Sequence, residues 1–573
     1  MSNESALIKI HTAVQSGLVD YADYTLARFV DDKLPNCGDI DLWLLVLVNV
    51  QLRAGHVCLD HDAIPAVAKN AGWMDCPSSV PEKNVLSRSP IIGGIEQDKI
   101  LVYDLQRFYL QRFFRYENQL AEKMISLSKF NQSLSPDILQ KVEGLFELSS
   151  PSYENWQKTA ALVSCQRKLC LISGGPGTGK TWTVCRILAA LFYADPVLNI
   201  SLAAPTGKAA ARLNDSINKL LQNLPVEEKI KKLIPQEAQT LHRLLGINRY
   251  SHQPKYNHQT KLSCDVLIVD EASMVDLQTM DQISQALDKN ARLILLGDKN
   301  QLASVEAGSV FADLCSGFKQ SEHSVELQHS YRFTEGSSIG LAAEAVNTAN
   351  EHGLIQALNS GKDVVWQQGQ LSDFQSMLLQ QIKSNYQPLL SATSIEQAFE
   401  IFYHFQILVS GRHGDYGAES INDQIDQDFL RRGLIDQSGF YAGKPLMMRS
   451  NDYFNQVFNG DIGIIWPDVK GQLMLWFEVS DGNYKILSLA QVNSSETAYA
   501  MTVHKSQGSE FNTVWLVLPQ IESPVCSREW LYTGITRVVK NLHVWGSEKS
   551  LVSALKRKTE RASGLAERLL QNL

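Results

Sequence analysis

The stretch Gly174-Gly175-Pro176-Gly177-Thr178-Gly179-Lys180-Thr181 follows the spacing G-x-x-x-x-G-K-[ST]. Residues 168–173 predict a short buried strand before it, and residues 181–193 predict a helix with one apolar face after it. In such a turn, glycines let backbone N–H groups point at phosphate oxygens beside the positive end of the helix. Lys180 is then expected to contact the β- and γ-phosphates, and Thr181 to place its hydroxyl on Mg²⁺. The stretch predicts a nucleoside triphosphate site. The alternative, a glycine-rich turn without a ligand, is disfavoured by the strand and helix around it.

A second apolar strand, Leu267-Ile268-Val269, ends in the carboxylates of Asp270 and Glu271. Asp270 is expected to hold Mg²⁺ through water, and Glu271 to position or activate an attacking water. Many strands end in acidic turns, so this pattern is weak alone. Together with the glycine-rich loop it predicts a site that hydrolyses its nucleotide.

Length and composition indicate a multidomain globular protein. The chain has 573 residues, 44% of them hydrophobic and 20% charged, which suits about three or four domains. It has no apolar run as long as a membrane span, and its first residues lack the pattern of a secretory signal. Its nine cysteines form no C-x-x-C pair, which argues against zinc ribbons, iron–sulfur clusters and disulfide scaffolds. We therefore expect a cytoplasmic location.

The formal net charge is −8, whereas proteins that coat nucleic acid are usually basic. Any contact with nucleic acid must then lie in a local channel, or within an assembly that supplies more positive charge.

Four regions are expected along the chain, in an α/β fold class. Residues 1–125 predict a mainly helical domain, and 126–152 a connector. Strands alternate with helices over 153–340, which predicts a parallel sheet covered on both faces. A second α/β unit over 341–573 carries a small inserted β-barrel near 438–495. The strands expected in the first unit are 169–173, 200–204, 266–270, 292–296 and 324–327.

Several shorter segments give specific expectations. Residues 41–52 predict a buried helix, and 248–261 an exposed excursion or hairpin. The aromatic- and arginine-rich segment 106–120 predicts one helix, either facing a partner or packed in the core with a solvated basic edge. A strand is expected near 393–408, a hairpin turn at Asp481-Gly482, and one solvated amphipathic helix with a basic face over 550–573.

Further segments carry a family resemblance. Six segments resemble motifs I, Ia, II, III, V and VI of the superfamily 1 helicases and occur in the correct order along the chain. They are the two nucleotide-site segments and residues 204–213, 296–302, 500–511 and 531–537. Residues 155–157 resemble the adenine-reading Q element, 239–243 motif Ib and 330–333 motif IV. The segments 297–306, 443–447, 458–463 and 502–511 are similar to the RecD branch, and the N-terminal segments 55–59 and 108–117 resemble it less distinctively.

The resemblance to the RecD family implies a fold and an activity. The fold would be two RecA-like motor domains, one with a short pin near 248–261 and the other with an inserted SH3-like barrel, after a mainly helical N-terminal domain that docks on partners. The activity would be that of an ATP-dependent 5′-to-3′ DNA helicase using ATP and Mg²⁺. The implied partners are RecB-like and RecC-like subunits in a heterotrimer acting on single-stranded and double-stranded DNA ends for recombinational repair and degradation of linear DNA. Nuclease activity would belong to a partner.

The resemblance also implies roles for individual residues. A translocase needs its nucleotide in a cleft between two α/β units, where cations neutralise the γ-phosphate. The expected catalytic residues are Lys180, Asp270, Glu271, Gln301, Arg332 and Arg537. Gln157, residues 174–181 and Glu510 would bind the nucleotide, with Thr181 and Asp270 at the metal. The expected DNA contacts are Thr206, Thr240, His242, Thr502 and His504. Lys208 and Arg212 either add charge for DNA or lie on a helix face.

Two rival functions remain open at this point. One is a RecD-like helicase that acts alone. The longer relatives of this kind carry additional N-terminal DNA-binding modules, and we expect this chain to be too short to contain them. The other is a non-motor subunit that merely retains a nucleotide site. The intact set of expected catalytic residues argues against the second.

Overall fold

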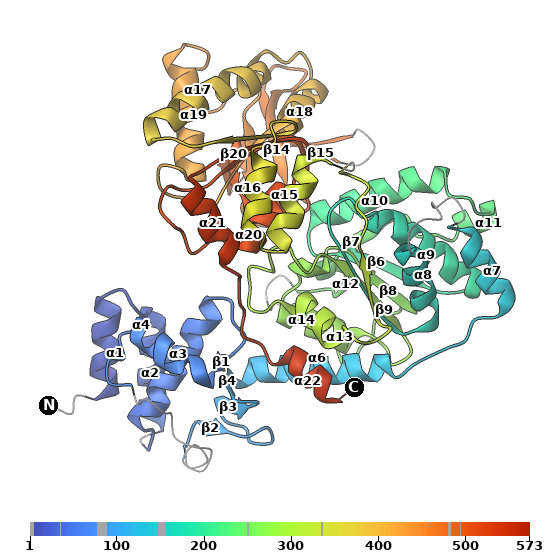
Figure 1. Ribbon diagram of the computed structural model, residues 1–573, viewed down its shortest axis with the longest axis vertical. Helices are drawn as coiled ribbons and strands as arrows, with labels where there is room; N and C mark the ends of the chain where they lie inside the picture. The colour runs from blue at the N-terminus through green and yellow to red at the C-terminus, as the bar shows by residue number, and fades with distance from the viewer. Residues whose placement is uncertain are drawn as a thin grey trace.

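Two parallel β-sheets, a smaller antiparallel sheet and a mainly helical N-terminal region make up the protein (Figure 1). The computed structural model describes residues 5–572 apart from 35, 77–88, 147–154, 249–250, 252, 334–335, 453, 480–482 and 493. The turn expected at Asp481-Gly482 lies outside the described residues. Within them, no helix combines the length and apolarity that a bilayer crossing requires.

The first parallel sheet confirms the five strands expected in this part of the chain and adds a sixth, β7. Its order is β10 (Ser324–Leu327), β5 (Leu169–Gly174), β9 (Arg292–Gly297), β8 (Val266–Val269), β6 (Ile200–Ala204) and β7 (Ala238–Thr240). All neighbouring pairs are parallel. The carboxyl ends of all six strands therefore meet along one edge, where the glycine-rich loop follows β5 and the carboxylates of Asp270 and Glu271 follow β8.

Alternating side chains of this sheet build two separate cores. Leu169, Leu171, Leu293 and Leu295 face one core, whereas Cys170, Ile172, Ile294 and Leu296 face the other. The second face is covered by α8 (Trp156–Gln166), α9 (Lys180–Ala194), α10 (Gly207–Gln222) and α7 (Pro136–Gly144). The first face is covered by α6 (Gln111–Ser128), α13 (Leu277–Ala286), α14 (Val310–Gly317) and α22 (Leu565–Asn572). Since α7 packs into the core that it shares with α8, α9 and α10, residues 136–144 of the expected connector belong to the first α/β unit.

The second parallel sheet has the order β11 (Val364–Gln367), β20 (Val538–Trp545), β19 (Phe511–Val517), β12 (Phe405–Val409) and β18 (Ala500–Thr502). Its helices are α15 (Ser338–Asn347), α16 (Glu351–Leu358), α17 (Leu371–Gln381), α18 (Ile395–His404), α19 (Ala418–Arg431), α20 (Arg528–Ile535) and α21 (Glu548–Lys556). The strand expected near 393–408 is wrong in its first part, which is α18. Ile395, Phe399 and Phe402 recur at helical spacing and are buried.

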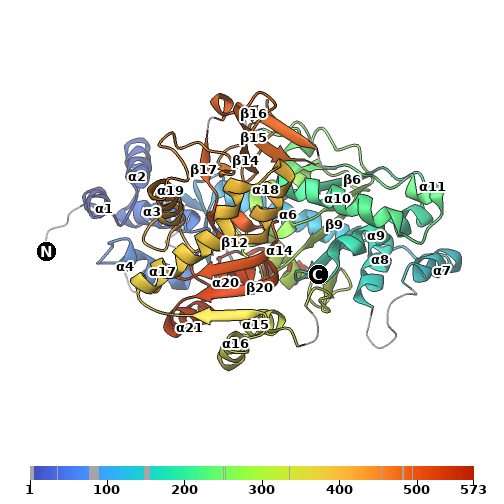
Figure 2. The same ribbon diagram turned by 90° about the horizontal axis from the view of Figure 1, so that it is seen from above.

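A five-stranded antiparallel sheet lies between strands β12 and β18 of the second sheet in sequence. It runs β16 (Tyr484–Ser488), β15 (Leu473–Glu478), β14 (Ile462–Pro467), β13 (Pro445–Met448) and β17 (Ser495–Thr497). It has its own small core, which includes Leu446, Ile465 and Leu475. Figure 2 shows β16, β15 and β14 one below another, with β16 at the upper edge of the view. The loop before β14 touches the start of α10, since a Cβ on Gly207 would lie 2.6 Å from the side chain of Phe458.

The N-terminal region packs α1 (Ala6–Gln15), α2 (Tyr21–Lys33), α3 (Asp39–Arg53) and α4 (Ile64–Asn70) beside a sheet of short strands. These are β1 (Leu59–Asp60), β4 (Arg107–Leu110), β3 (Leu101–Asp104) and β2 (Ile92–Gly93). The buried helix expected over 41–52 is confirmed as part of α3. The single helix expected over 106–120 is wrong at its start, because Leu105 and Gln106 have φ values of 47° and 58° and turn the chain into β4.

The last segment of the chain also differs from expectation. Residues 550–573 do not form one exposed helix: α21 ends at Lys556, an extended stretch follows, and α22 begins at Leu565. Arg561 donates to the carbonyls of Glu306, at 2.6 Å, and Gly308, at 3.0 Å. Basic side chains here therefore make internal contacts. In Figure 1 the red chain runs from α21 on the second sheet to α22 beside α14 and α6.

Candidate active site

The glycine-rich loop joins β5 to α9, as the sequence predicts. Gly177 and Gly179 have φ values of 78° and 79°, a left-handed conformation that glycine adopts without steric cost. A Cβ on Gly177 would overlap the side chain of Arg332, and the backbone N–H of Tyr331 donates to the Gly177 carbonyl at 2.8 Å. The segment after β10 is thus held directly against the loop.

Lys180 and Asp270 lie close enough to interact electrostatically. The Nζ of Lys180 donates to the carbonyls of Gly174 and Gly175, at 2.7 and 3.3 Å. Burial and the neighbouring Glu271 together raise the pKa of Asp270 to about 6, while Lys180 opposes the shift. A carboxylate in this state gains from a cation, which makes it suited to a metal beside phosphate oxygens.

Glu271 turns sharply at the end of β8. Its φ is 53°, a left-handed conformation unusual for a residue with a side chain, and its N–H donates to Oδ1 of Asp270 at 2.9 Å. Strain of this kind is often found at functional sites. The turn brings Glu271 to the wall of a cleft of about 210 Å³ that the loop also lines.

This cleft brings the expected catalytic residues together. Its lining includes Lys180, Thr181, Asp270, Glu271, Gln301, Arg332, Glu510 and Arg537. Gln157 lies behind the loop instead, where its buried Nε2 donates to the Thr178 carbonyl at 3.0 Å. Gln157 therefore supports the loop in this structure, and its contact with a base stays a prediction.

The segment that contains Gln301 links the first α/β unit to the second through the next residue, Leu302. The Nε2 of Gln301 donates to Oδ2 of the buried Asp298 at 3.1 Å. The next residue, Leu302, donates its N–H to Oγ1 of Thr533 in α20 at 2.9 Å and accepts from Nε2 of Gln507 at 2.7 Å. Movement of the second sheet against the first must therefore displace the segment beside Gln301.

Two arginines reach the cleft from opposite sides. Arg332, which follows β10, donates to Oε1 of Glu510 at 2.5 Å and to the Thr536 carbonyl at 3.2 Å. Arg537 is only 3% exposed and donates to the carbonyls of Thr533 and Ser509. Burial lowers the pKa of Arg537, whereas Glu271 and Glu510 raise it. Both arginines line the cleft, and their contact with a γ-phosphate stays a prediction.

Sequence reasoning missed Arg212 as a nucleotide-site residue. It lies in the cleft, with its guanidinium 2.5 Å from Oε1 of Glu510 and NH1 donating to the Gly508 carbonyl at 3.2 Å. The available signal was helical spacing, because Ala209, Arg212, Leu213 and Ser216 share the face of α10 that lines the cleft. Burial alone would raise the pKa of Glu510, but Arg212 and Arg332 hold it at about 2.

The expected DNA-contact residues fall into two groups at strand ends. Thr206 caps α10 after β6, and Thr240 ends the neighbouring strand β7 and caps α12 (Leu241–Leu244), which contains His242. Thr502 ends β18 of the second sheet, and His504 lies in the short 3₁₀ helix that follows (Val503–Ser506). Burial lowers the pKa of His504, as does Arg561. Their contact with a strand stays a prediction.

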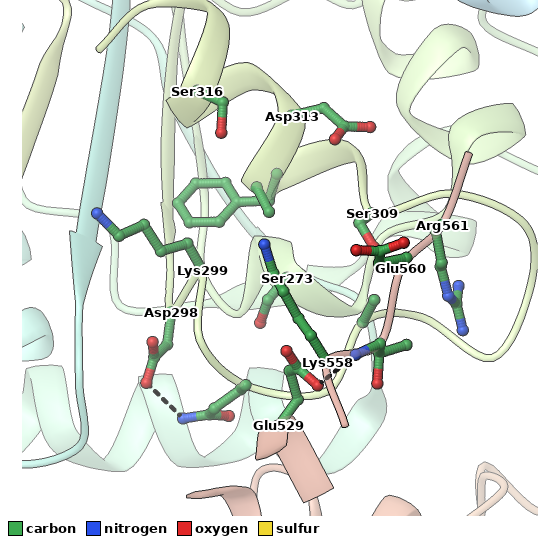
Figure 3. Close-up of a pocket in the computed structure, with 15 residues that line it drawn as sticks. Ser273, Asp298, Lys299, Ser309, Asp313, Ser316, Glu529, Lys558, Glu560 and Arg561 are labelled. Carbon is green, nitrogen blue, oxygen red and sulfur yellow. Dashed lines mark hydrogen bonds between the residues drawn. The ribbon is translucent and has the colours of Figure 1, made fainter. Parts of the chain in front are cut away.

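A second cavity, of about 280 Å³, lies beneath the C-terminal extended stretch (Figure 3). Lys558, Glu560 and Arg561 come from that stretch, Glu529 from α20, and Asp298 and Lys299 from the loop after β9. The N–H of Thr559 donates to Oε2 of Glu529 at 2.9 Å. Gln301 lines both this cavity and the nucleotide cleft, so the segment after β9 forms the wall between them.

Comparisons with known proteins agree with this geometry. Residues 157–307 match the model of an AAA domain, and residues 497–544 that of a UvrD-like helicase C-terminal domain. Residues 15–109 match the N-terminal domain of RecBCD enzyme subunit RecD. The chain is 34% identical over 570 residues to RecBCD enzyme subunit RecD of Mycobacterium tuberculosis (strain ATCC 25618 / H37Rv), covering 97% of this chain and 96% of the relative. It is 32% identical over 653 residues to the protein of that name from Haemophilus influenzae, covering 98% and 99%.

More distant matches follow. The ATP-dependent RecD2 DNA helicase of Deinococcus radiodurans is 30% identical over 407 residues, covering 70% of this chain and 50% of the relative. Pif1 helicase from Bacteroides, solved with ADP-AlF3 and ssDNA, is 17% identical with a TM-score of 0.38, covering 75% of this chain and 95% of that structure. Near-full-length identity above 30% to the RecD subunits decides the assignment: this chain belongs to the family of RecBCD enzyme subunit RecD.

Proposed function

We propose that this chain is the ATP-dependent 5′-to-3′ DNA helicase subunit of a RecBCD-type heterotrimer with RecB-like and RecC-like subunits. The heterotrimer would process DNA double-strand ends for recombinational repair and degradation of linear DNA. The observation that carries the motor role is the cleft itself, which is lined by Lys180 and Asp270 from the first sheet and by Arg537 and Glu510 from the second. When a nucleotide is bound between two units, its hydrolysis can move one unit relative to the other. A subunit that only binds a nucleotide does not need such a cleft.

The domain organisation is part of the proposal. We assign the first motor domain to residues 153–340 and the second to 341–573, with an SH3-like barrel near 438–495. The separate core of the antiparallel sheet supports the barrel. Two observations adjust the edges: α15 begins at Ser338 and packs with the second sheet, and α22 packs with the first. The turn from Asn257 to Thr260 supports a short pin near 248–261 as a strand separator.

The residues of the cleft fit ATP and Mg²⁺. Thr181 offers a hydroxyl and Asp270 a carboxylate, which are oxygen ligands of the kind that Mg²⁺ prefers. When bound, Mg²⁺ supplies positive charge beside the β- and γ-phosphate oxygens. Lys180 would exchange its bonds to the Gly174 and Gly175 carbonyls for phosphate oxygens. Glu271 would orient the attacking water and accept its proton.

Closure of the cleft would complete the site. Arg332 and Arg537 would neutralise the charge that develops on the γ-phosphate, and Gln301 would transmit the state of the cleft to α20 through the neighbouring Leu302. On the strand side, Thr206, Thr240, His242, Thr502 and His504 would contact the DNA backbone. Cleft closure and opening would then alter the separation of the Thr206 and Thr502 groups and move single-stranded DNA in small steps.

A strand-displacement assay tests the proposal. Duplexes with 5′ or 3′ single-stranded tails are unwound by the chain alone and by the chain with its two candidate partners, using wild type, Lys180→Gln and the exposed control Lys289→Gln. We expect unwinding of the 5′-tailed duplex by wild type and control, and none by Lys180→Gln. Unwinding that survives Lys180→Gln contradicts the motor role, unwinding of 3′ tails alone contradicts the polarity, and full activity without partners favours a helicase that acts alone.

A further inference from the structure

Arg212 connects the two sheets through one carboxylate oxygen. It belongs to α10 of the first unit, yet its guanidinium contacts the Gly508 carbonyl and Glu510 of the second. Arg332 takes the same oxygen, Oε1 of Glu510, also at 2.5 Å. Glu510 therefore has two cationic partners, both contributed by the first unit.

The two arginines differ in what else they contact. Arg332 is held at the phosphate loop, because the neighbouring Tyr331 bonds to Gly177 and Ser330 donates to the Pro176 carbonyl at 3.1 Å. Arg212 is held on α10, a helix that begins after Thr206, and Thr206 accepts from the Ala209 N–H at 3.2 Å. One arginine is thus attached to the nucleotide side of the first unit and the other to its expected strand side.

Because Glu510 is shared, one partner can leave without stranding a partly buried charge. The Glu510 side chain is only 25% exposed, so its carboxylate gains from a cation beside it. If Arg332 turned to a γ-phosphate, Arg212 would keep Glu510 neutralised. Without Arg212, the same turn would leave Glu510 facing the phosphates with no partner of its own, and like charges repel.

We propose that Arg212 is a positioning residue for hydrolysis, which holds Glu510 while Arg332 turns to the γ-phosphate. Through this contact, Arg212 couples closure of the cleft to the end of α10 that is expected to contact DNA. The inference rests on the proposed roles of Arg332 and Thr206. Arg212 itself need not contact the reacting phosphate. The contacts on Gly508 and Glu510 also make α10 the direct path from Thr206 to the second sheet, with Arg212 about two turns along the helix.

Steady-state ATP hydrolysis with and without single-stranded DNA tests this role. The variants are Arg212→Ala, Arg212→Lys and Lys219→Ala, an exposed control on the same helix, in the full chain or its complex. We expect Arg212→Ala to lower the ratio of DNA-stimulated to basal kcat by about tenfold, the size of a typical coupling between sites, with less effect on KM for ATP. Arg212→Lys restores part of the ratio, since it keeps the charge but loses the second bond. Lys219→Ala leaves the ratio unchanged.

A double-mutant comparison separates positioning from plain stability. In a Glu510→Gln background, Arg212→Ala should change the ratio by less than about twofold, because the group it holds is gone. Equal losses of basal and stimulated rates in Arg212→Ala, or the same loss in the Glu510→Gln background, overturn the proposal. If circular dichroism shows that Arg212→Ala folds poorly, Arg212→Lys provides the test. A ratio of DNA-stimulated to basal kcat in Arg212→Lys equal to that of wild type then overturns the proposal. Arg332→Ala is run in parallel: if it keeps wild-type activity, the role proposed for Arg332 has failed instead.

Discussion

Arg332 donates to Oε1 of Glu510 at 2.5 Å, although the two residues come from different α/β units. Arg332 follows the edge strand of the first sheet, and Glu510 immediately precedes β19 in the second. The pair therefore bridges the two units beside the cleft. The stem of Arg332 also lies against the glycine-rich loop, because a Cβ on Gly177 would overlap the Cβ of Arg332. An arginine that can exchange a carboxylate for a phosphate responds to the nucleotide by changing partner.

Replacing Arg332 tests this exchange. Arg332→Ala removes the cation expected at the γ-phosphate, so we expect DNA-stimulated kcat to fall by about 10³-fold or more, with a smaller change in KM. Arg332→Lys should recover little, because a lysine cannot reproduce the fixed, planar arrangement of guanidinium donors. Arg431→Ala, an exposed arginine of α19, is the matched control. A kcat loss below about tenfold in Arg332→Ala would show that the residue serves only the ion pair.

Glu510 makes stability depend on acidity. Arg212 and Arg332 hold its pKa at about 2, against an ordinary value of 4.5. Because the folded-state pKa is depressed, the ion pairs stabilise the fold fully above about pH 4.5, and this contribution, roughly 3 kcal/mol, disappears as the pH falls towards 2.

The measurement compares urea unfolding of wild type and Glu510→Gln between pH 6 and pH 2, followed by tryptophan fluorescence. At pH 6 the wild type should unfold at higher urea, and the difference between the two midpoints should shrink steadily below about pH 4.5. A midpoint difference that stays constant over this range would mean that Glu510 is not ionised through its arginine partners.

Glu117 and Arg568 provide a structural test of the C-terminal segment. Glu117 of α6 is fully buried and accepts from Arg568 Nε at 2.9 Å, from the Gly564 N–H at 3.0 Å and from the Ser563 hydroxyl at 3.1 Å. Arg568→Met leaves this carboxylate without its cation, which should lower the free energy of unfolding by about 3–5 kcal/mol.

Two further variants control for this effect. Arg115 lies in the same helix α6, and Arg115→Met removes its exposed ion pair with Asp98, which should cost less than about 1 kcal/mol. Adding Glu117→Gln to Arg568→Met should recover part of the loss, because the buried charge is removed. Similar losses in Arg568→Met and Arg115→Met by chemical denaturation would contradict a buried pair.

How far the sequence predicts this structure depends on the range of the contacts involved. The loop at 174–181 and the strand before Asp270 are local patterns, and both occupy their expected places in the parallel sheet. The prediction of one helix over 550–573 was wrong, because contacts with residues far away in the chain, such as that of Arg561 with Glu306, hold the stretch between α21 and α22. Arg212 was missed for the same reason, because its partner Glu510 comes from the other α/β unit. Helical spacing alone could not decide whether Arg212 contacts DNA or simply lies on a helix face.

Lys208 carries the last prediction, on the strand side of the first unit. It lies in the first turn of α10, two residues after Thr206, and burial lowers its pKa to about 8 while Asp461 opposes the shift. A lysine held near a DNA phosphate releases a counterion on binding, so Lys208→Met should reduce the slope of log affinity for single-stranded DNA against log salt by about 0.7. Lys219→Met, on the exposed side of the same helix, should leave the slope unchanged. In the wild type, affinity should also weaken as the pH rises through about 8, because free Lys208 then loses its proton, and this dependence should be absent in Lys208→Met. An unchanged salt slope in Lys208→Met would instead mean that the ammonium group of Lys208 interacts with Asp461 and that the neutral Thr206 contacts the DNA.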